Sequence, residues 1–365
     1  MPLLGERSMR PWLRRVSVSV GALVCLLIVG CGSTYNAPAP PPPPPNPIGH
    51  VYFTTANSLL GYAIAASNGG LGAVTVPTTA PGGTAIASDG PGHHLYTLTS
   101  GGQIYGYGLN TSNGSLTSIA GSPFGGAGVG SAFLTIDAAG ANLYVPAMQD
   151  LVVVPYTIGS GGALTIGLQV GTPATPLTAT VDPPGHFLYV PMGSAGTELF
   201  QITAGALASV ETILPQGQGK AVSIAITPAD TFAYISDAVS GVAGYSVNAT
   251  TGNLTPLAGS PFAAGTGPSA MVMTASGKFL YVANAVGLVS FAINADGSLT
   301  SIGSPITLGI APLAVSIEPT GAYLYVISVN STVVNIYQIN STTGLLTAQP
   351  SFGLTAVPTG IATTP

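Results

Sequence analysis

This chain offers few side chains that could do chemistry, since only 5% of its 365 residues are charged. Three of them, Glu198, Lys220 and Asp237, lie within 40 residues of one another. A lysine beside two carboxylates can bind a polar ligand or carry out general acid–base catalysis. The alternative is a solvated ion pair or a set of loop caps. Asn284 is a further polar candidate for ligand binding.

The elements that must position these residues come from a unit of about 45 residues that recurs seven times. Each unit carries a tyrosine within a strand-like segment of the Leu-Tyr-Val type, and a second aromatic follows it by about ten residues. The tyrosines are Tyr52, Tyr96, Tyr144, Tyr189, Tyr234, Tyr281 and Tyr325. The second aromatics are Tyr62, Tyr107, Tyr156, Phe200, Tyr245, Phe291 and Tyr337. This period, with short strands and glycine-rich turns, is typical of a β-propeller with one blade per repeat.

Each repeat divides into four short segments with the composition of strands: an apolar one, the tyrosine strand, an alternating one such as Val333–Ile339, and one opening with Gly and Leu. The first repeat starts at its tyrosine strand, and the chain ends on Thr359–Pro365, which resembles the missing first strand. We therefore predict an all-β, seven-bladed propeller with four-stranded blades. We expect it to span residues 48–365 and to close by pairing the C-terminal strand with the N-terminal blade, which leaves no free edge.

In a propeller, one mouth of the central channel is formed by the loops between second and third strands and by the links from a fourth strand to the next blade. Glu198, Lys220, Asp237 and Asn284 fall in or beside such loops, so we expect them at that mouth. The four histidines, His50, His93, His94 and His186, instead precede repeat tyrosines and belong on the opposite rim. They are spread over blades one, two and four, so we expect neither a metal site nor a cofactor.

The first 47 residues have a different character. Residues 1–30 combine a basic start with the apolar run Val16–Gly30, as in a secretory signal. The ending Ile28-Val29-Gly30-Cys31 resembles a bacterial lipobox, which implies cleavage before Cys31 and lipid on its thiol. Residues 31–47 hold a proline-rich tract, expected to be an extended linker. An ordinary secretory signal or an uncleaved anchor is the alternative.

The lipobox implies an exported protein attached to the membrane through Cys31, and Gly32 favours the outer membrane if the cell is Gram-negative. Cleavage there would leave Lys220 and Lys278 as the basic residues against ten acidic ones, a formal charge of −8. Such a chain has no basic stripe for phosphates, so we expect no nucleic-acid binding. We expect a monomer.

One stretch of the repeat is specific enough to suggest a family. Gly277-Lys278-Phe279-Leu280-Tyr281-Val282-Ala283-Asn284, with Val289–Ile293 and Asp296–Thr300 behind it, resembles the unit of lactonase-type seven-bladed propellers. These include 6-phosphogluconolactonase-like proteins and the YVTN repeat proteins. The resemblance covers about residues 48–365 and implies, for activity, lactone hydrolysis or a related cycloisomerase reaction.

Enzymes of that family that act on acidic sugars use basic residues and histidine at the channel mouth. This chain has no arginine beyond residue 15 and no histidine in its mouth loops. We therefore expect a binding or scaffold protein of the cell envelope rather than an enzyme, with a glycan, a peptide or another protein as its partner. The alternative is an exported lactonase that uses Glu198 or Asp237 as a base or to orient water.

Overall fold

The computed structural model describes residues 41–44, 46–128, 130–216, 219–239 and 241–365. Cys31, the predicted signal segment and most of the predicted linker lie outside these residues. The described chain consists of strands, turns and loops and contains no helix. It therefore includes no helix that could cross a membrane.

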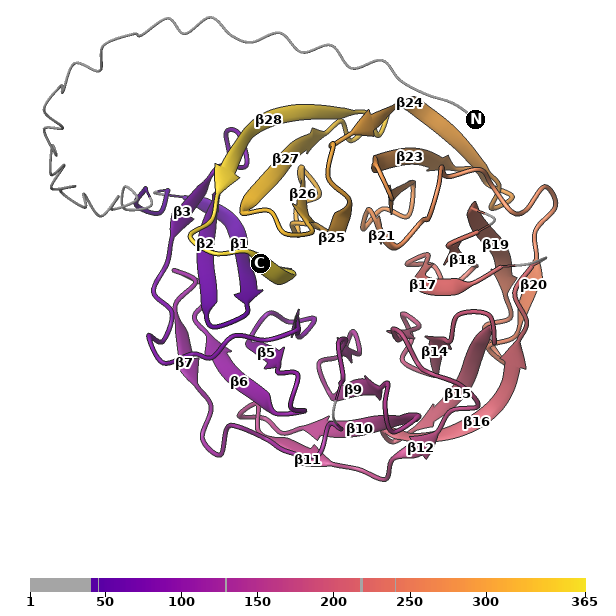
Figure 1. Ribbon diagram of the computed structural model, residues 1–365, viewed down its shortest axis with the longest axis horizontal. Helices are drawn as coiled ribbons and strands as arrows, with labels where there is room; N and C mark the ends of the chain where they lie inside the picture. The colour runs from indigo at the N-terminus through magenta and orange to yellow at the C-terminus, as the bar shows by residue number, and fades with distance from the viewer. Residues whose placement is uncertain (1–40, 45, 129, 217–218, 240) are drawn as a thin grey trace, which may run out of the picture. The chain divides into compact units, whose positions relative to one another are not determined.

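Seven antiparallel sheets surround a central opening, and each sheet is one blade (Figure 1). Blade 1 orders β29 (Pro358–Thr364), β1 (Pro47–Thr55), β2 (Leu59–Ala65) and β3 (Leu71–Ala73) from inside to outside. Blade 2 holds β4 (Ala85–Ser88), β5 (His94–Leu98), β6 (Ile104–Leu109) and β7 (Leu116–Ser118). Blade 3 holds β8 (Thr135–Ile136), β9 (Asn142–Ala147) and β10 (Val152–Ile158), with its outer edge shared by β11 (Leu164–Ile166) and β12 (Val170–Gly171).

The remaining four blades repeat the same order of first, second, third and fourth strand. Blade 4 holds β13 (Thr180–Val181), β14 (Phe187–Pro191), β15 (Thr197–Thr203) and β16 (Ala206–Ile213). Blade 5 holds β17 (Ala221–Ile226), β18 (Phe232–Asp237), β19 (Gly241–Val247) and β20 (Leu254–Pro256). Blade 6 holds β21 (Ala270–Met273), β22 (Phe279–Asn284), β23 (Gly287–Ile293) and β24 (Leu299–Thr307). Blade 7 holds β25 (Pro312–Ile317), β26 (Tyr323–Ser328), β27 (Val333–Ile339) and β28 (Leu346–Gly353).

The ring closes as the sequence predicts. The C-terminal strand β29 pairs antiparallel with β1, with Tyr52 opposite Ala362 and His50 opposite Thr364. This pairing gives blade 1 its innermost strand, so its inner edge is not left open to other chains. In Figure 1 the yellow C-terminal strand lies beside the indigo first strands. The prediction of a seven-bladed, all-β propeller closed in this way is confirmed.

The hydrophobic core lies between blades, because each of the seven buried clusters draws its residues from two neighbouring blades. Each repeat tyrosine of the second strands is fully buried at such a boundary. Tyr281 of blade 6, for example, packs in one cluster with Leu324 and Tyr337 of blade 7. Burial of these large rings favours a closed ring, since an unpaired blade would expose one apolar face.

Two sets of loops border the channel at its two ends. We call the loops between second and third strands, together with the links that enter each first strand, the mouth. The turns between first and second strands form the opposite rim. Because strands alternate in direction, every blade presents the same kind of loop to the same end.

Candidate functional site

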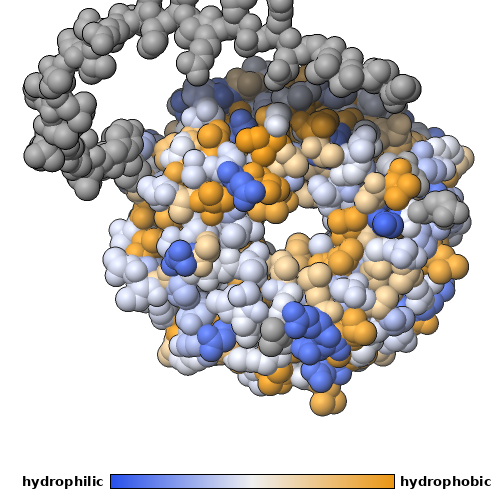
Figure 2. All heavy atoms as spheres, in the orientation of Figure 1, coloured by the Kyte–Doolittle hydropathy of each residue, from blue (hydrophilic) through white to orange (hydrophobic). Residues whose placement is uncertain are grey.

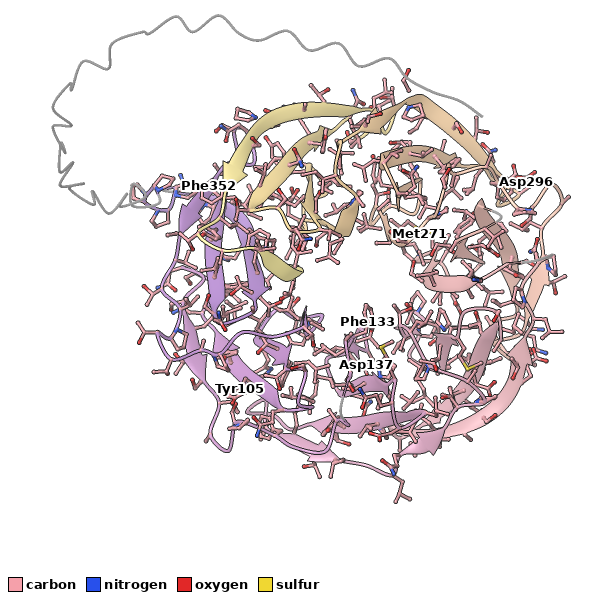
Figure 3. All side chains as sticks on the ribbon, viewed as in Figure 1. Tyr105, Phe133, Asp137, Met271, Asp296 and Phe352 are labelled. Atoms are coloured by element: carbon pink, nitrogen blue, oxygen red, sulfur yellow. The ribbon has the colours of Figure 1, made fainter. Side chains whose placement is uncertain are left out.

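The channel is lined by the first strands of all seven blades. Side chains from these strands enclose a cavity of ≈ 640 Å³ whose lining residues are all uncharged. Hydroxyls of Thr84, Thr180 and Ser223 alternate there with apolar groups, and Phe133 and Met271 lie beside the opening in Figure 3. Figure 2 shows the opening, rimmed mainly by pale and orange residues. The channel therefore suits a ligand without a strong charge.

A second cavity of ≈ 510 Å³ lies at the mouth between blades 1 and 2. Asn57 lines it from the β1–β2 loop, and Thr99 and Ser100 line it from the β5–β6 loop. The link residues 81–83 supply backbone, and two of them are Gly82 and Gly83. A Cβ at Gly82 would run into the backbone of Thr55 and Ala56, so the close approach of these loops requires glycine. Our sequence analysis did not single out these residues, although their place in second-to-third-strand loops is a signal for them.

Lys220 and Asp237 come together at the mouth of blade 5. Lys220 is exposed and stands directly before β17, a strand that lines the channel. Its backbone N–H donates to Asp237 Oδ1 at 2.9 Å, and the N–H of Val239 donates to the same oxygen at 2.9 Å. Asp237 is 2% exposed, and the backbone of Gly219 packs against its carboxylate. Asp237 thus holds the segment that carries Lys220.

The loop of blade 4 approaches the same place. Gly193 and Ala221 exchange two backbone hydrogen bonds, with N···O distances of 2.9 and 3.1 Å. This bridge joins the β14–β15 loop to the first residue of β17. Lys220 therefore sits on a backbone that is fixed from two sides, by Asp237 of its own blade and by Gly193 of the preceding blade.

Glu198 lies near the mouth end of β15, but its carboxylate is buried within blade 4. Its exposed fraction is 2%, and its two oxygens accept hydrogen bonds from the hydroxyls of Ser209 and Thr212. Both donors are on β16, the outermost strand, which is the strand farthest from the channel. This arrangement ties β15 to β16 and leaves neither oxygen turned to the channel.

Asn284 closes its own turn rather than facing a ligand. Its Nδ2 donates to the carbonyl oxygen of Ala264 at 3.0 Å, and its Oδ1 accepts from the N–H groups of Val286 and Gly287 at 3.0 Å each. The side chain is 3% exposed. Its hydrogen-bonding groups thus hold the β22–β23 loop and tie it to the link between β20 and β21.

The histidines lie at the opposite rim, as their register in the repeat predicts. His94 is paired with Asp89, with 2.8 Å between Nδ1 and Oδ2, and His50 Nδ1 lies 3.2 Å from the carbonyl oxygen of Pro365. Among the described residues, no group of three or more His, Cys, Asp or Glu side chains is placed to hold a metal ion.

Solved structures share this fold over most of the chain. A protein of Lactobacillus plantarum matches with a TM-score of 0.73 and 19% identity over 87% of this chain and 99% of its own. A proposed 6-phosphogluconolactonase of Bacteroides uniformis matches with a TM-score of 0.77 and 18% identity over 87% and 99% of the two chains. The periplasmic gluconolactonase of Pseudomonas aeruginosa matches with a TM-score of 0.71 and 17% identity over 87% and 99%. A search of curated proteins gives no match.

The family comparison is more specific than the shared fold. The model of the seven-bladed β-propeller lactonases matches residues 94–284 and 223–359, which together make up most of the propeller. This match contradicts our prediction of a binding or scaffold protein and supports the alternative, a lactonase-like hydrolase, better. We predicted a binding or scaffold protein because the mouth loops lack arginine and histidine. Membership of the family does not depend on those residue types. The chain belongs to the lactonase family of seven-bladed β-propellers.

Proposed function

We propose that this protein hydrolyses a lactone at the channel mouth, with Lys220 as the residue that meets the reacting carbonyl. The observation that carries the proposal is the placement of Lys220 in a chain of the lactonase family. This exposed ammonium group stands where a channel-lining strand begins, on a backbone held by Asp237.

The chemistry needs one charge stabiliser and one proton acceptor. Attack of water on the lactone carbonyl develops negative charge on the carbonyl oxygen, and a positioned ammonium group stabilises that charge. We assign this task to Lys220. A carboxylate must accept the proton of the attacking water and return it to the ring oxygen as the C–O bond breaks. We assign this task to Asp237, and the product is the open-chain hydroxy acid.

Glu198 is a poor choice for the second task. Both of its oxygens already accept hydroxyl hydrogens from β16, the strand of blade 4 that is farthest from the channel. A general base must come within hydrogen-bond reach of the proton that it takes. We therefore treat Glu198 as a residue that supports the blade.

The substrate class follows from charge. The cavity of the channel has no charged lining residue, and the pocket between blades 1 and 2 is likewise lined by uncharged residues, whose polar groups are amide, hydroxyl and backbone groups. A phosphorylated lactone carries two negative charges that such a surface does not match, and Lys220 and Lys278 are the only lysines of the chain. We therefore propose a lactone without phosphate.

The test is hydrolysis followed by proton release in a pH-stat, with glucono-δ-lactone as the neutral substrate and its 6-phosphate as the anionic one. We expect saturable turnover of the neutral lactone, and a loss of kcat on the order of 10²-fold in Lys220→Met and in Asp237→Asn. Lys278→Met is the matched control, since this exposed lysine lies in the β21–β22 turn of the opposite rim. No turnover above the heat-denatured sample would overturn the proposal, and equal rates in Lys220→Met and Lys278→Met would overturn the role of Lys220.

We also propose that the enzyme is exported and held at the cell envelope by lipid on Cys31. Support comes from the signal-like composition of residues 1–30 and from the ending Ile28–Cys31. Growth with labelled palmitate should label the wild type and the Cys25→Ser control but leave Cys31→Ser unlabelled. Equal labelling of the two variants would exclude Cys31 as the anchor.

A further inference from the structure

The first-to-second-strand turns of the opposite rim share one design. In each, a residue that we call the cap residue ends the first strand, and a residue that we call the turn residue follows three positions later. The N–H of the turn residue donates to the carbonyl oxygen of the cap residue. The cap residues of blades 2 to 7 are Asp89, Asp137, Asp182, Thr227, Thr274 and Glu318, and the turn residues are Gly92, Gly140, Gly185, Asp230, Gly277 and Gly321.

Blade 5 departs from this design at its turn residue. The five glycines have φ between 67° and 78°, a region that favours glycine. Asp230 holds the same conformation with φ 53°. A non-glycine residue in this conformation is strained relative to glycine, although aspartate tolerates it better than most residues. Asp230 therefore places a carboxylate at a turn where five other blades have no side chain.

Blade 4 departs from the design at the partner of its cap residue. In blades 2 and 3 the second carboxylate oxygen of the cap residue accepts a hydrogen bond from the side chain five positions later. Asp89 Oδ2 pairs with His94 and Asp137 Oδ2 accepts from Asn142, each at 2.8 Å. In blade 4 that position holds Phe187, which has no donor, and Asp182 Oδ2 is buried without a hydrogen-bond partner.

These two departures meet at one place. The first strands of blades 4 and 5 contact each other beside these turns, because the hydroxyl of Thr180 donates to the carbonyl oxygen of Ile224 at 3.1 Å. In blade 3, a Cβ on the turn residue Gly140 would lie 3.1 Å from Cβ of Asp89, the cap residue of blade 2. Asp230 of blade 5 lies close to Asp182 of blade 4, because the charge of Asp182 acts on Asp230 and both carboxylates act on the same neighbours, Tyr189 and His186. Burial and the charge of Asp182 raise the pKa of Asp230 to about 6.

Together, Asp182 and Asp230 have three carboxylate oxygens that accept no hydrogen bond from the protein. Asp182 is 1% exposed and Asp230 is 7% exposed. Asp182 Oδ1 accepts from the N–H groups of His186 and Phe187, but its Oδ2 and both oxygens of Asp230 have no donor. Buried carboxylates without partners are costly and are normally paired with a cation or bound to a metal. His186 is the basic side chain whose charge acts on both carboxylates, and it is exposed.

We propose that Asp182 and Asp230 form a binding site for a hard divalent cation of the Ca²⁺ type, which joins blades 4 and 5 at the opposite rim. Three carboxylate oxygens are the ligand type that such ions prefer, and Asp230, with both oxygens open, can bind in bidentate fashion. Two side chains supply these ligands, and water and backbone carbonyls complete the shell, as is common for Ca²⁺. The bound charge removes the repulsion between the carboxylates and offsets the strain at Asp230.

The test is calorimetric titration of the EDTA-treated protein with CaCl₂ at pH 7.5, repeated with MgCl₂ and MnCl₂, and thermal unfolding with and without each ion. We expect one site per chain and a rise in Tm with Ca²⁺, because an ion that binds the folded state stabilises it. Asp230→Gly and Asp182→Asn should each weaken binding at least tenfold and remove the rise in Tm. Asp296→Asn, which removes an exposed carboxylate at the periphery (Figure 3), should retain both.

Asp230→Gly carries the test if Asp182→Asn fails to fold, since five other blades place glycine at this turn. The absence of saturable binding by all three ions at millimolar concentration would overturn the proposal. Wild-type affinity in Asp230→Gly would overturn it as well. Because the readouts are heat and Tm, neither result depends on whether the protein hydrolyses lactones.

Discussion

Tyr281 of blade 6 donates a hydrogen bond from its hydroxyl to the carbonyl oxygen of Gly344 in blade 7, at 2.9 Å. The same bond to a glycine carbonyl of the next blade recurs for five other repeat tyrosines. One of these five, Tyr325, closes the ring by donating to Gly69 of blade 1 at 2.8 Å. Tyr144 of blade 3 is the exception, because its buried hydroxyl has no partner. The β15–β16 turn of blade 4 is short, and its Gly205 instead packs on the side chain of Asn142.

This contrast supplies a matched pair of variants. Tyr281→Phe removes a buried hydrogen bond and leaves a carbonyl without its donor, so the free energy of unfolding should fall by about 1–2 kcal/mol. Tyr144→Phe removes a hydroxyl that is already unpaired, so it should be neutral or stabilising. Urea unfolding followed by tyrosine fluorescence measures both. Equal losses in the two variants would show that the bond to Gly344 contributes nothing specific.

Deletion of residues 358–365 should weaken the ring at its seam. These residues form β29, the innermost strand of blade 1, and Thr363 also donates to the carbonyl oxygen of Ile317 in blade 7 at 2.8 Å. Their loss leaves β1 with a free edge, and such edges pair with other chains. We expect a lower Tm and concentration-dependent oligomers in size-exclusion chromatography. A monomer with the wild-type Tm would contradict a closing role for β29.

The burial of His50 leads us to predict that the protein loses stability in mild acid. Its Nδ1 donates to the carbonyl oxygen of Pro365, so the proton-free Nε2 is the nitrogen that lies buried without a partner. Burial lowers the pKa of His50 below 6.5. The unfolded chain therefore binds the proton more readily, and the contribution of His50 to stability is complete above pH 6.5 and is lost as pH falls below it.

The measurement is Tm between pH 7.5 and pH 5. His50→Phe should remove the loss of Tm that His50 causes below pH 6.5, because the ring of phenylalanine does not titrate. His93→Gln replaces an exposed histidine at the same rim and should leave the curve unchanged. A His50→Phe curve that runs parallel to the wild-type curve across this range would refute the role of His50.

Glu198→Gln separates support of the blade from catalysis. The change replaces a carboxylate that accepts from Ser209 and Thr212 with an amide that has only one acceptor oxygen, so the free energy of unfolding should fall by about 1–3 kcal/mol. We expect kcat for the neutral lactone to stay within about twofold of the wild type, since the side chain does not face the channel. A loss of kcat comparable to that of Asp237→Asn, at unchanged stability, would instead place Glu198 at the reaction.

The candidate site was harder to predict than the blades that hold it. The sequence places Lys220 and Asp237 in mouth loops, and the structure joins them through one backbone hydrogen bond. It also predicts Glu198 and Asn284 as mouth residues, yet the side chain of Glu198 is bonded to an outer strand. The side chain of Asn284 is bonded to its own loop and to the neighbouring link between β20 and β21. The position of a residue in a loop can be predicted from the repeat. The direction of its side chain depends on which hydrogen-bonding groups the tertiary structure places beside it.

The repeat by itself determined the architecture of this protein. Seven tyrosine strands specify seven blades, and a C-terminal segment that resembles the missing first strand specifies their closure. The sequence is sufficient for this because strand patterning and turns are local properties that occur in every repeat. Only the tertiary structure decided which polar groups are satisfied. Asp182 and Asp230 are 48 residues apart and belong to different blades, and they share surroundings because the first strands of blades 4 and 5 meet, where Thr180 donates to the carbonyl oxygen of Ile224. Contacts of that kind depend on how blades stack, which no single repeat encodes.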